Sequence, residues 1–128
     1  MSAAMDIPLS ECVAKVTSTR GFGYAVRDFL DQFRHEPDMR LITEEPPLLS
    51  SILKDEGVAD AYLASVAATL AHEQGLPAPD WAKGSARSLE KPFFAAKTPK
   101  LKAVLLQESP VEFRIRNIFV SANALSRA

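Results

Sequence analysis

The chain has 128 residues, of which 47% are hydrophobic and 24% charged, and its formal net charge is −1. These values are typical of one globular domain with its own core, and they exclude a disordered chain. The single cysteine excludes an internal disulfide and a cysteine-based zinc site. No apolar run reaches the roughly 20 residues that span a bilayer, and the N-terminus has no signal pattern, so we expect a cytoplasmic protein without membrane association.

Two helices are predicted at the N-terminus. An apolar stripe over residues 8–18 predicts the first, with Cys12 as a buried structural thiol. A second stripe, rich in phenylalanine, predicts a helix over residues 22–35. We interpret Gly21 and Gly23 as the tight connection between these two helices.

The stretch at residues 37–47 is the least helical part of the chain. Residues 39–43 are predicted to be extended, and the Glu-Glu-Pro-Pro run that follows is typical of a turn, because a residue before proline is forced out of the α region. We expect this stretch to separate an N-terminal helical pair (1–36) from the main bundle (44–128) within one domain of residues 1–128.

An alanine-rich segment at residues 58–75 gives the clearest helical pattern. Its apolar side chains recur at the spacing of one helix face, namely Ala59, Tyr62, Leu63, Val66, Ala67 and Leu70. Asp60 and His72 fall on the opposite face, and Gly75 suits a left-handed C-cap. We therefore expect an all-α fold, an irregular single-domain bundle around this central helix.

Two further helix starts are predicted near the carboxyl end. Thr98 and Ser109 each stand directly before a proline, which places a capping hydroxyl ahead of the first helical residue. In the first of these helices, Leu101 and Val104 are expected to face inward. Residues 118–120 are apolar and β-branched and are predicted to be extended; whether they pair with the earlier extended piece stays open.

The residue types that carry catalysis do not form a recognised motif. Gly21-Phe22-Gly23 lacks the lysine and the further glycines of a phosphate-binding loop, and His72-Glu73 lacks the second histidine of a zinc-protease helix. With only two histidines in the chain, a histidine-based metal site is not expected. We therefore predict a non-enzymatic protein with no catalytic, cofactor-binding or metal-binding residues.

Basic residues concentrate toward the carboxyl end. Residues 1–75 hold 6 Lys/Arg and 12 Asp/Glu, whereas residues 76–128 hold 9 and 4. Two arrangements fit this asymmetry: the halves pair within the fold, or the basic half contacts an acidic protein or a nucleic acid. The candidate contact residues are Lys97, Lys100, Lys102, Arg114 and Arg116.

The C-terminal string ESPVEFRIRNIFVSANALSR, residues 108–127, is more distinctive than any of these patterns. Together with Glu45-Pro46-Pro47, the central helix and GLPAPDW at residues 75–81, it resembles a family of small uncharacterised bacterial proteins. Genes of that family stand beside nucleotidyltransferase-like or helix-turn-helix genes, as in toxin–antitoxin operons. The resemblance covers residues 44–128 and implies a partner encoded by a neighbouring gene, but it implies no catalytic residue.

The same string carries many apolar side chains, namely Phe113, Ile115, Ile118, Phe119 and Val120. Either they pack on the central helix, or they dock on a partner with Arg114 and Arg116 at the rim. The leading functional prediction is a non-enzymatic, antitoxin-like interaction module, whose basic and apolar C-terminal half covers a partner's acidic or catalytic cleft. The alternative is a small nucleic-acid-binding regulator that uses the same basic residues. Neither function needs a cofactor.

Overall fold

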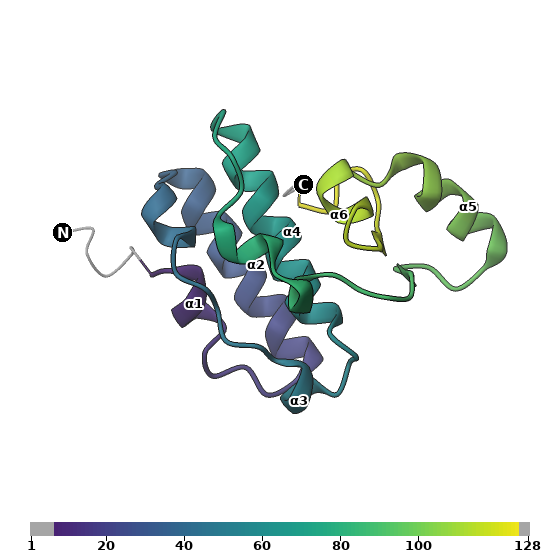
Figure 1. Cartoon of the computed structure of the whole chain (residues 1–128), viewed down its shortest axis with the longest axis horizontal. Coiled ribbons are helices and arrows are strands. Elements are labelled where there is room, and N and C mark those ends of the chain that lie inside the picture. Colours follow the sequence, from purple (N-terminus) through teal and green to yellow (C-terminus); the bar gives the residue numbers. More distant parts are fainter. Residues whose placement is uncertain (1–6, 126–128) are drawn as a thin grey trace.

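The computed structural model of the protein describes residues 7–125. Within this range the chain forms six α-helices, three 3-10 helices and one pair of short strands, which confirms the predicted all-α fold with a minor extended pair. In chain order the elements are α1 (Leu9–Cys12), α2 (Thr19–His35), η2 (Met39–Ile42), α3 (Ser50–Leu53), α4 (Val58–Glu73), η3 (Asp80–Lys83), η4 (Ser85–Arg87), β1 (Phe93–Phe94), α5 (Pro99–Glu108), α6 (Val111–Arg114) and β2 (Ile118–Phe119). Figure 1 shows α1 to α4 as one group, and α5 extending away from it.

The predicted central helix is α4, and it is covered on nearly all sides. It contacts α3, η3, η4, α6 and β2, because its many alanines leave room for close neighbours. Eleven of its 16 residues are buried. Asp60, which we predicted on a polar face, is one of them and is only 2% exposed. The prediction was wrong at this residue because the first turns of α4 have no free face.

Both ends of α4 are closed by local hydrogen bonds. At the start, the Asp55 carboxylate accepts from the backbone N–H groups of Gly57 and Ala59. At the end, Gly75 has a φ of 74°, and the N–H groups of Gly75 and Leu76 donate to the carbonyl groups of His72 and Ala71. This is the Schellman arrangement, and it confirms the predicted left-handed C-cap.

The N-terminal helices differ from the prediction in their bounds. The first, α1, has four residues instead of the eleven expected over 8–18. The second, α2, begins at Thr19 because the Ser18 hydroxyl accepts from the N–H of Gly21 at 3.0 Å. Gly21 and Gly23 therefore lie inside α2 and do not form a connection, since the serine cap fixes an earlier start than the phenylalanine stripe suggested.

Residues 118 and 119 form a strand, as predicted, but they pair with residues 93 and 94 and not with residues 39–43. Strands β1 and β2 are parallel, with Phe93 opposite Ile118 and Phe94 opposite Phe119. Asn117, with a φ of 66°, redirects the chain after α6, and its side-chain Nδ2 donates to the carbonyl of Leu89 at 2.9 Å. Residues 39–42, which we predicted to be extended, form the 3-10 helix η2 instead, capped by the Asp38 carboxylate.

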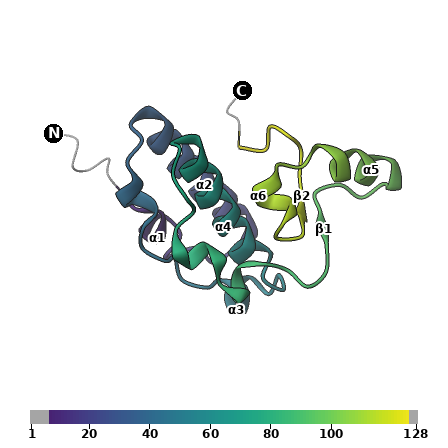
Figure 2. The same cartoon turned by 45° about the horizontal axis from the view of Figure 1, so that its top comes forward.

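Three aromatic rings connect the helices of the core. Tyr62 of α4 makes edge-on contacts with Phe22 of α2 and with Phe113 of α6, at centroid distances of 6.1 and 5.2 Å. Of the five apolar side chains considered above, Phe113, Ile118, Phe119 and Val120 are buried, whereas Ile115 is 68% exposed. Packing inside the protein is therefore the observed arrangement for four of these five. In Figure 2, α6 and the two strands lie between α4 and α5.

Candidate interaction surface

The largest fully buried side chain of the protein is a charged one, Arg87, at 1% exposure. Its guanidinium donates to the Glu45 carboxylate at 3.1 Å and to the backbone carbonyl groups of Pro46 and Asp60. It also lies over the Trp81 ring, 5.0 Å from the centroid. These contacts connect η4 to α4 and to the Glu45-Pro46-Pro47 segment. Because the side chain is buried, Arg87 is not a surface cation.

Arg116 is a second arginine that the fold uses internally. Its guanidinium donates to the carbonyl of Ala82 at 3.0 Å and to that of Glu112 at 2.7 Å, and burial lowers its pKa. We predicted Arg116 as a contact residue for a partner, but the structure places it in the interior. Its packing against the Ala82 carbonyl joins the C-terminal string to η3.

The remaining predicted contact residues lie on the surface but on two elements. Lys97 and Lys100 are exposed at the start of α5, and Lys102 is half-buried with its Nζ 5.5 Å from the centre of the Phe94 ring. Arg114 is exposed on α6, which packs against α4. The structure therefore places Lys100 and Lys102 on α5, Lys97 just before its N-cap, and Arg114 on α6.

The two explanations of the charge asymmetry apply to different residues. Arg87, from the basic half, pairs with Glu45 of the acidic half, so part of the asymmetry is neutralised within the fold. Within residues 7–125, by contrast, no ion pair joins Lys97, Lys100 or Arg114 to a carboxylate. These three cations are therefore not neutralised by an ion pair within that range.

The lysines belong to a segment that we call the α5 arm, residues 97–108. Its helix starts as predicted, with the Thr98 hydroxyl accepting from the N–H of Leu101 at 3.2 Å. The arm contacts β2, and Leu105 is its buried side chain. Figures 1 and 2 both show α5 projecting beyond α6, on the side away from α4.

Apolar side chains remain exposed on the α5 arm. Leu101, Val104 and Leu106 are 53%, 46% and 49% exposed. We predicted that Leu101 and Val104 face inward, and the structure contradicts this because the helix stands clear of the core. Leu101 and Val104, three residues apart, share one side of the helix, and Leu106 points to another. Exposed apolar side chains beside lysines on a projecting helix are typical of a surface that contacts another macromolecule.

Ser109 closes the α5 arm in a way the sequence pattern did not predict. We expected its hydroxyl to cap the next helix, but α6 has no side-chain cap. The buried Ser109 Oγ instead accepts from the N–H of Val120 at 2.9 Å and lies 2.6 Å from the carbonyl oxygen of Leu105. These hydrogen bonds attach the carboxyl end of α5 to the residue that follows β2.

The charges on α5 run against its own dipole. A helix has a partial positive charge at its amino end and a partial negative charge at its carboxyl end. Lys100 and Lys102 nevertheless stand near the start of α5 and Glu108 at its end, and the first turn has no acidic residue. Each such placement costs roughly 0.3–1 kcal/mol at low ionic strength. The lysines therefore do not stabilise the helix that carries them.

The reactive side chains of the described chain belong to separate elements. Burial of Cys12, with Asp28 and Glu11 nearby, raises the pKa of its thiol to about 11, so the weakly nucleophilic thiol form prevails at neutral pH. Cys12 is half-buried and not fully buried as predicted. His35 is exposed at the end of α2, and His72 Nδ1 lies 2.7 Å from Glu112 Oε2, where it links α4 to α6.

Residues 7–125 contain neither a cluster of metal-ligating side chains nor a helix that could span a membrane. No group of three His, Cys, Asp or Glu side chains is placed to hold a metal ion. None of the helices in this range has the length and apolar character needed to cross a membrane.

Comparison with protein-family models, with curated proteins and with solved structures found no match for this chain. The family resemblance of residues 44–128 thus stays a prediction, and its last three residues, 126–128, lie outside the described part of the chain.

Proposed function

We propose that this chain is a non-enzymatic interaction module that binds another protein through the α5 arm. The observation that carries the proposal is the arm itself, in which the half-exposed Leu101 and Val104 lie one helical turn apart on a projecting helix, with Lys100 and Lys102 in the same helix and Lys97 just before it. A helix of this kind binds by laying its apolar side chains into a groove of the partner. The flanking lysines favour a partner whose groove has an acidic rim.

The mechanism we propose is occlusion. The arm enters an acidic, apolar cleft of the partner, and the rest of the chain blocks access to that cleft. The sequence resemblance to proteins from toxin–antitoxin-like operons favours the product of an adjacent gene as the partner. An antitoxin-like role in a bacterial cell is the form of this proposal that the resemblance supports.

The test is co-expression of the tagged chain with the products of the genes on either side of its own. The wild-type chain is expected to retain one of these products in a fixed molar ratio through affinity purification and gel filtration. Two variants are expected to lose it: Lys97→Glu/Lys100→Glu, which reverses the charge of the arm, and Leu101→Ser/Val104→Ser, which removes its apolar contacts. Both act on exposed side chains, so the fold is expected to survive.

Matched controls separate binding from general surface effects. Lys15→Glu/Lys54→Glu makes the same change of charge on the opposite half, and Ile52→Ser/Leu76→Ser removes two comparably exposed apolar side chains outside the arm. Both controls are expected to retain the partner. Retention of neither neighbouring product by the wild-type chain would contradict the proposal.

A nucleic acid is the competing partner, and the same variants distinguish it. If phosphates were the target, the charge-reversal variant would lose binding to DNA or RNA, and binding would weaken steeply with salt. The Leu101→Ser/Val104→Ser variant would then bind the nucleic acid as the wild type does. That pattern would replace the protein-binding proposal by the regulator alternative.

A further inference from the structure

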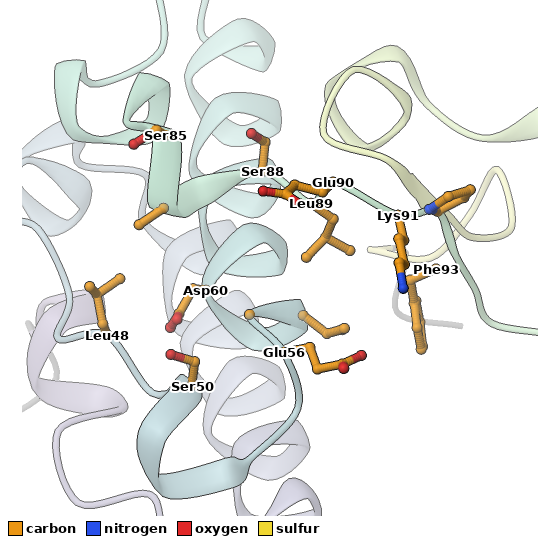
Figure 3. A pocket seen from close by; sticks show the side chains of 14 residues that line it. Leu48, Ser50, Glu56, Asp60, Ser85, Ser88, Leu89, Glu90, Lys91 and Phe93 are labelled. Carbon is orange, nitrogen blue, oxygen red and sulfur yellow. The ribbon is translucent and has the colours of Figure 1, made fainter.

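A groove of about 620 Å³ lies between the amino-terminal end of α4, the start of α3 and the segment of residues 85–93. It shares no residue with the α5 arm. Figure 3 looks into this groove and shows the side chains that line it. A volume in this range suits a small organic ligand or one long side chain of a bound peptide.

Asp60 supplies a carboxylate to the lining of this groove. Its side chain is 3% exposed; Oδ1 accepts from the N–H of Leu49 at 2.6 Å and lies 3.9 Å from Arg87 Nη1. Oδ2 accepts no hydrogen bond from any residue in the range 7–125. Because no fully buried side-chain oxygen in that range lacks a partner, Oδ2 is not completely enclosed, and Asp60 is among the residues that line the groove.

A second polar group stands at the same end of the groove. Figure 3 shows the Ser50 hydroxyl and the Asp60 carboxylate turned toward each other. A ligand group that contacts both oxygens has to donate at least two hydrogen bonds, and a carboxylate favours a donor with positive charge. A primary ammonium, with three N–H donors and a full charge, meets both requirements.

The charge of the lining also favours a cation. Glu56 and Glu90 line the groove together with Asp60, whereas Lys91 is the cation among its 14 lining residues. Arg87 is not part of the lining, but its Nη1 lies 3.9 Å from Asp60 Oδ1 and offsets the charge of Asp60, so the excess negative charge comes from Glu56 and Glu90 against Lys91. The rim carboxylates therefore leave the groove with an excess of negative charge, which attracts a cationic ligand.

The long side of the groove is apolar. Leu48, Val58, Leu89 and Phe93 line it, and Leu48 and Phe93 are among the exposed large apolar side chains of the protein. In the view of Figure 3, Leu89 lies between Asp60 and Phe93. An apolar stem that covers these side chains removes apolar surface from water and so contributes to binding.

We propose that this groove binds a primary ammonium group on an apolar stem. The ammonium contacts Asp60 Oδ2 and the Ser50 hydroxyl, and the stem runs past Leu89 toward Phe93. A free alkylamine and a lysine side chain of a peptide share this chemistry. The site is independent of the α5 arm, so the proposed function and this inference can fail separately.

The first test is a titration of the ¹⁵N-labelled chain with n-hexylammonium, followed by amide shifts in NMR spectra. Saturable shifts are expected at Gly57 and Leu89. 1-Hexanol has the same stem without the charge and is expected to bind roughly tenfold more weakly or worse, because the charge-assisted hydrogen bonds are lost. Equal binding of the two probes, or no saturable shift with n-hexylammonium at millimolar concentration, would overturn the proposal.

The second test uses variants of the groove. Asp60→Asn is expected to abolish binding of n-hexylammonium, but Asp60 also holds Leu49 and Arg87 in the fold. The double variant Glu56→Gln/Glu90→Gln leaves those contacts intact and is expected to weaken binding several-fold. Glu11→Gln/Glu36→Gln makes the same change of charge at exposed sites outside the groove and is the matched control. Equal affinity of the rim variant and this control would contradict the inference.

A third titration distinguishes the two sources of the ammonium. Lysine with an acetylated α-amino group and a methylamide carboxyl group presents an ammonium on a four-carbon stem within a peptide unit. Tighter binding of this probe than of n-butylammonium, which has the same stem length, assigns the groove to a lysine side chain of a peptide. Weaker binding assigns it to a free amine, and either result supports an ammonium site.

Discussion

Arg87 shows how a single residue holds distant parts of the chain together. Its guanidinium is removed from water, and this is tolerated only because carboxylate and carbonyl oxygens surround it. Asp60 stands beside it, also buried, and depends on Arg87 and the Leu49 N–H for its own stabilisation. Loss of the arginine therefore leaves an uncompensated negative charge inside the protein.

We expect Arg87→Met, which keeps most of the side-chain volume, to lower the free energy of unfolding by about 3–5 kcal/mol. The double variant Arg87→Met/Asp60→Asn is expected to lose less than the sum of the two single losses, because the second change removes the orphaned charge. Urea denaturation followed by circular dichroism measures all three variants. A loss below about 1 kcal/mol for Arg87→Met would mean that water reaches this site.

The contact between His72 and Glu112 makes stability depend on pH. Burial acts to raise the pKa of Glu112, but the hydrogen bond from His72, together with the charges of His72 and Arg116, outweighs it and lowers that pKa below its ordinary value of 4.5. A carboxyl group whose pKa is lower in the folded state stabilises the fold while it is ionised. Its contribution is complete above pH 4.5 and is lost as the pH falls through the lowered folded-state pKa.

We therefore expect Glu112→Gln to lower the urea midpoint at neutral pH and to have a smaller effect at pH 3, because the stabilising contribution of the ionised wild-type carboxylate declines as the pH falls below 4.5. Comparison of the two midpoints at both pH values checks this. The solvent-exposed Glu90→Gln variant is the control and is expected to have the midpoint of the wild type at neutral pH. An equal loss for Glu112→Gln at both pH values would show that its role is packing alone.

At the scale of the element, α4 and α5 are helices with opposite surroundings. Ala67 of α4 is fully buried, whereas Ala103 of α5 is exposed. A larger side chain at a closely packed position forces its neighbours apart, which costs about 1–3 kcal/mol. The same change on an exposed helix position usually lies within about 0.5 kcal/mol of zero.

Ala67→Leu is therefore expected to destabilise the protein by about 1–3 kcal/mol, and Ala103→Leu to leave the urea midpoint almost unchanged. Because alanine and leucine have similar helix propensities, the difference between the two variants reports packing and not helix formation. A comparable loss in Ala103→Leu would show that α5 is covered in solution, for example by a second copy of the chain.

Elements that are specified by local signals could be predicted from the sequence, and those specified by distant contacts could not. The periodicity of α4, the cap at Gly75 and the Thr98–Pro99 start of α5 each depend on a few neighbouring residues, and all are present. The strand pair was different, because its partner is selected by the left-handed turn at Asn117. No nearby residue identifies which strand that turn brings alongside.

The candidate site could be predicted only in part, for the same reason. The lysines of the α5 arm were identified because clustered charge is visible in the sequence. Arg116 was placed on the surface wrongly, since its acceptors are backbone carbonyl groups of other residues, which leave no mark in a side-chain pattern. The Asp60 carboxylate was missed because its place in the groove depends on η4 and on the segment that follows.

At the scale of the whole molecule, the question is whether the C-terminal string and the N-terminal helices unfold together. Phe113 of α6 is fully buried and contacts Tyr62 of α4, which in turn contacts Phe22 of α2. The only tryptophan, Trp81, stands elsewhere in the structure and donates its indole N–H to the carbonyl of Ile42. Its fluorescence therefore reports on η3 and its contact with η2, outside the C-terminal string.

We expect Phe113→Ala to lower the free energy of unfolding by about 3–5 kcal/mol, through lost burial and the cavity left between α4 and α6. Because the aromatic contacts join α6 to both α4 and α2, the Trp81 fluorescence transition is expected to shift together with the far-ultraviolet circular dichroism. Ile115→Ala removes a neighbouring exposed side chain and is expected to move neither transition. If Phe113→Ala shifts the dichroism and leaves the Trp81 transition in place, the C-terminal string unfolds on its own, and the prediction of one domain over residues 1–128 is wrong.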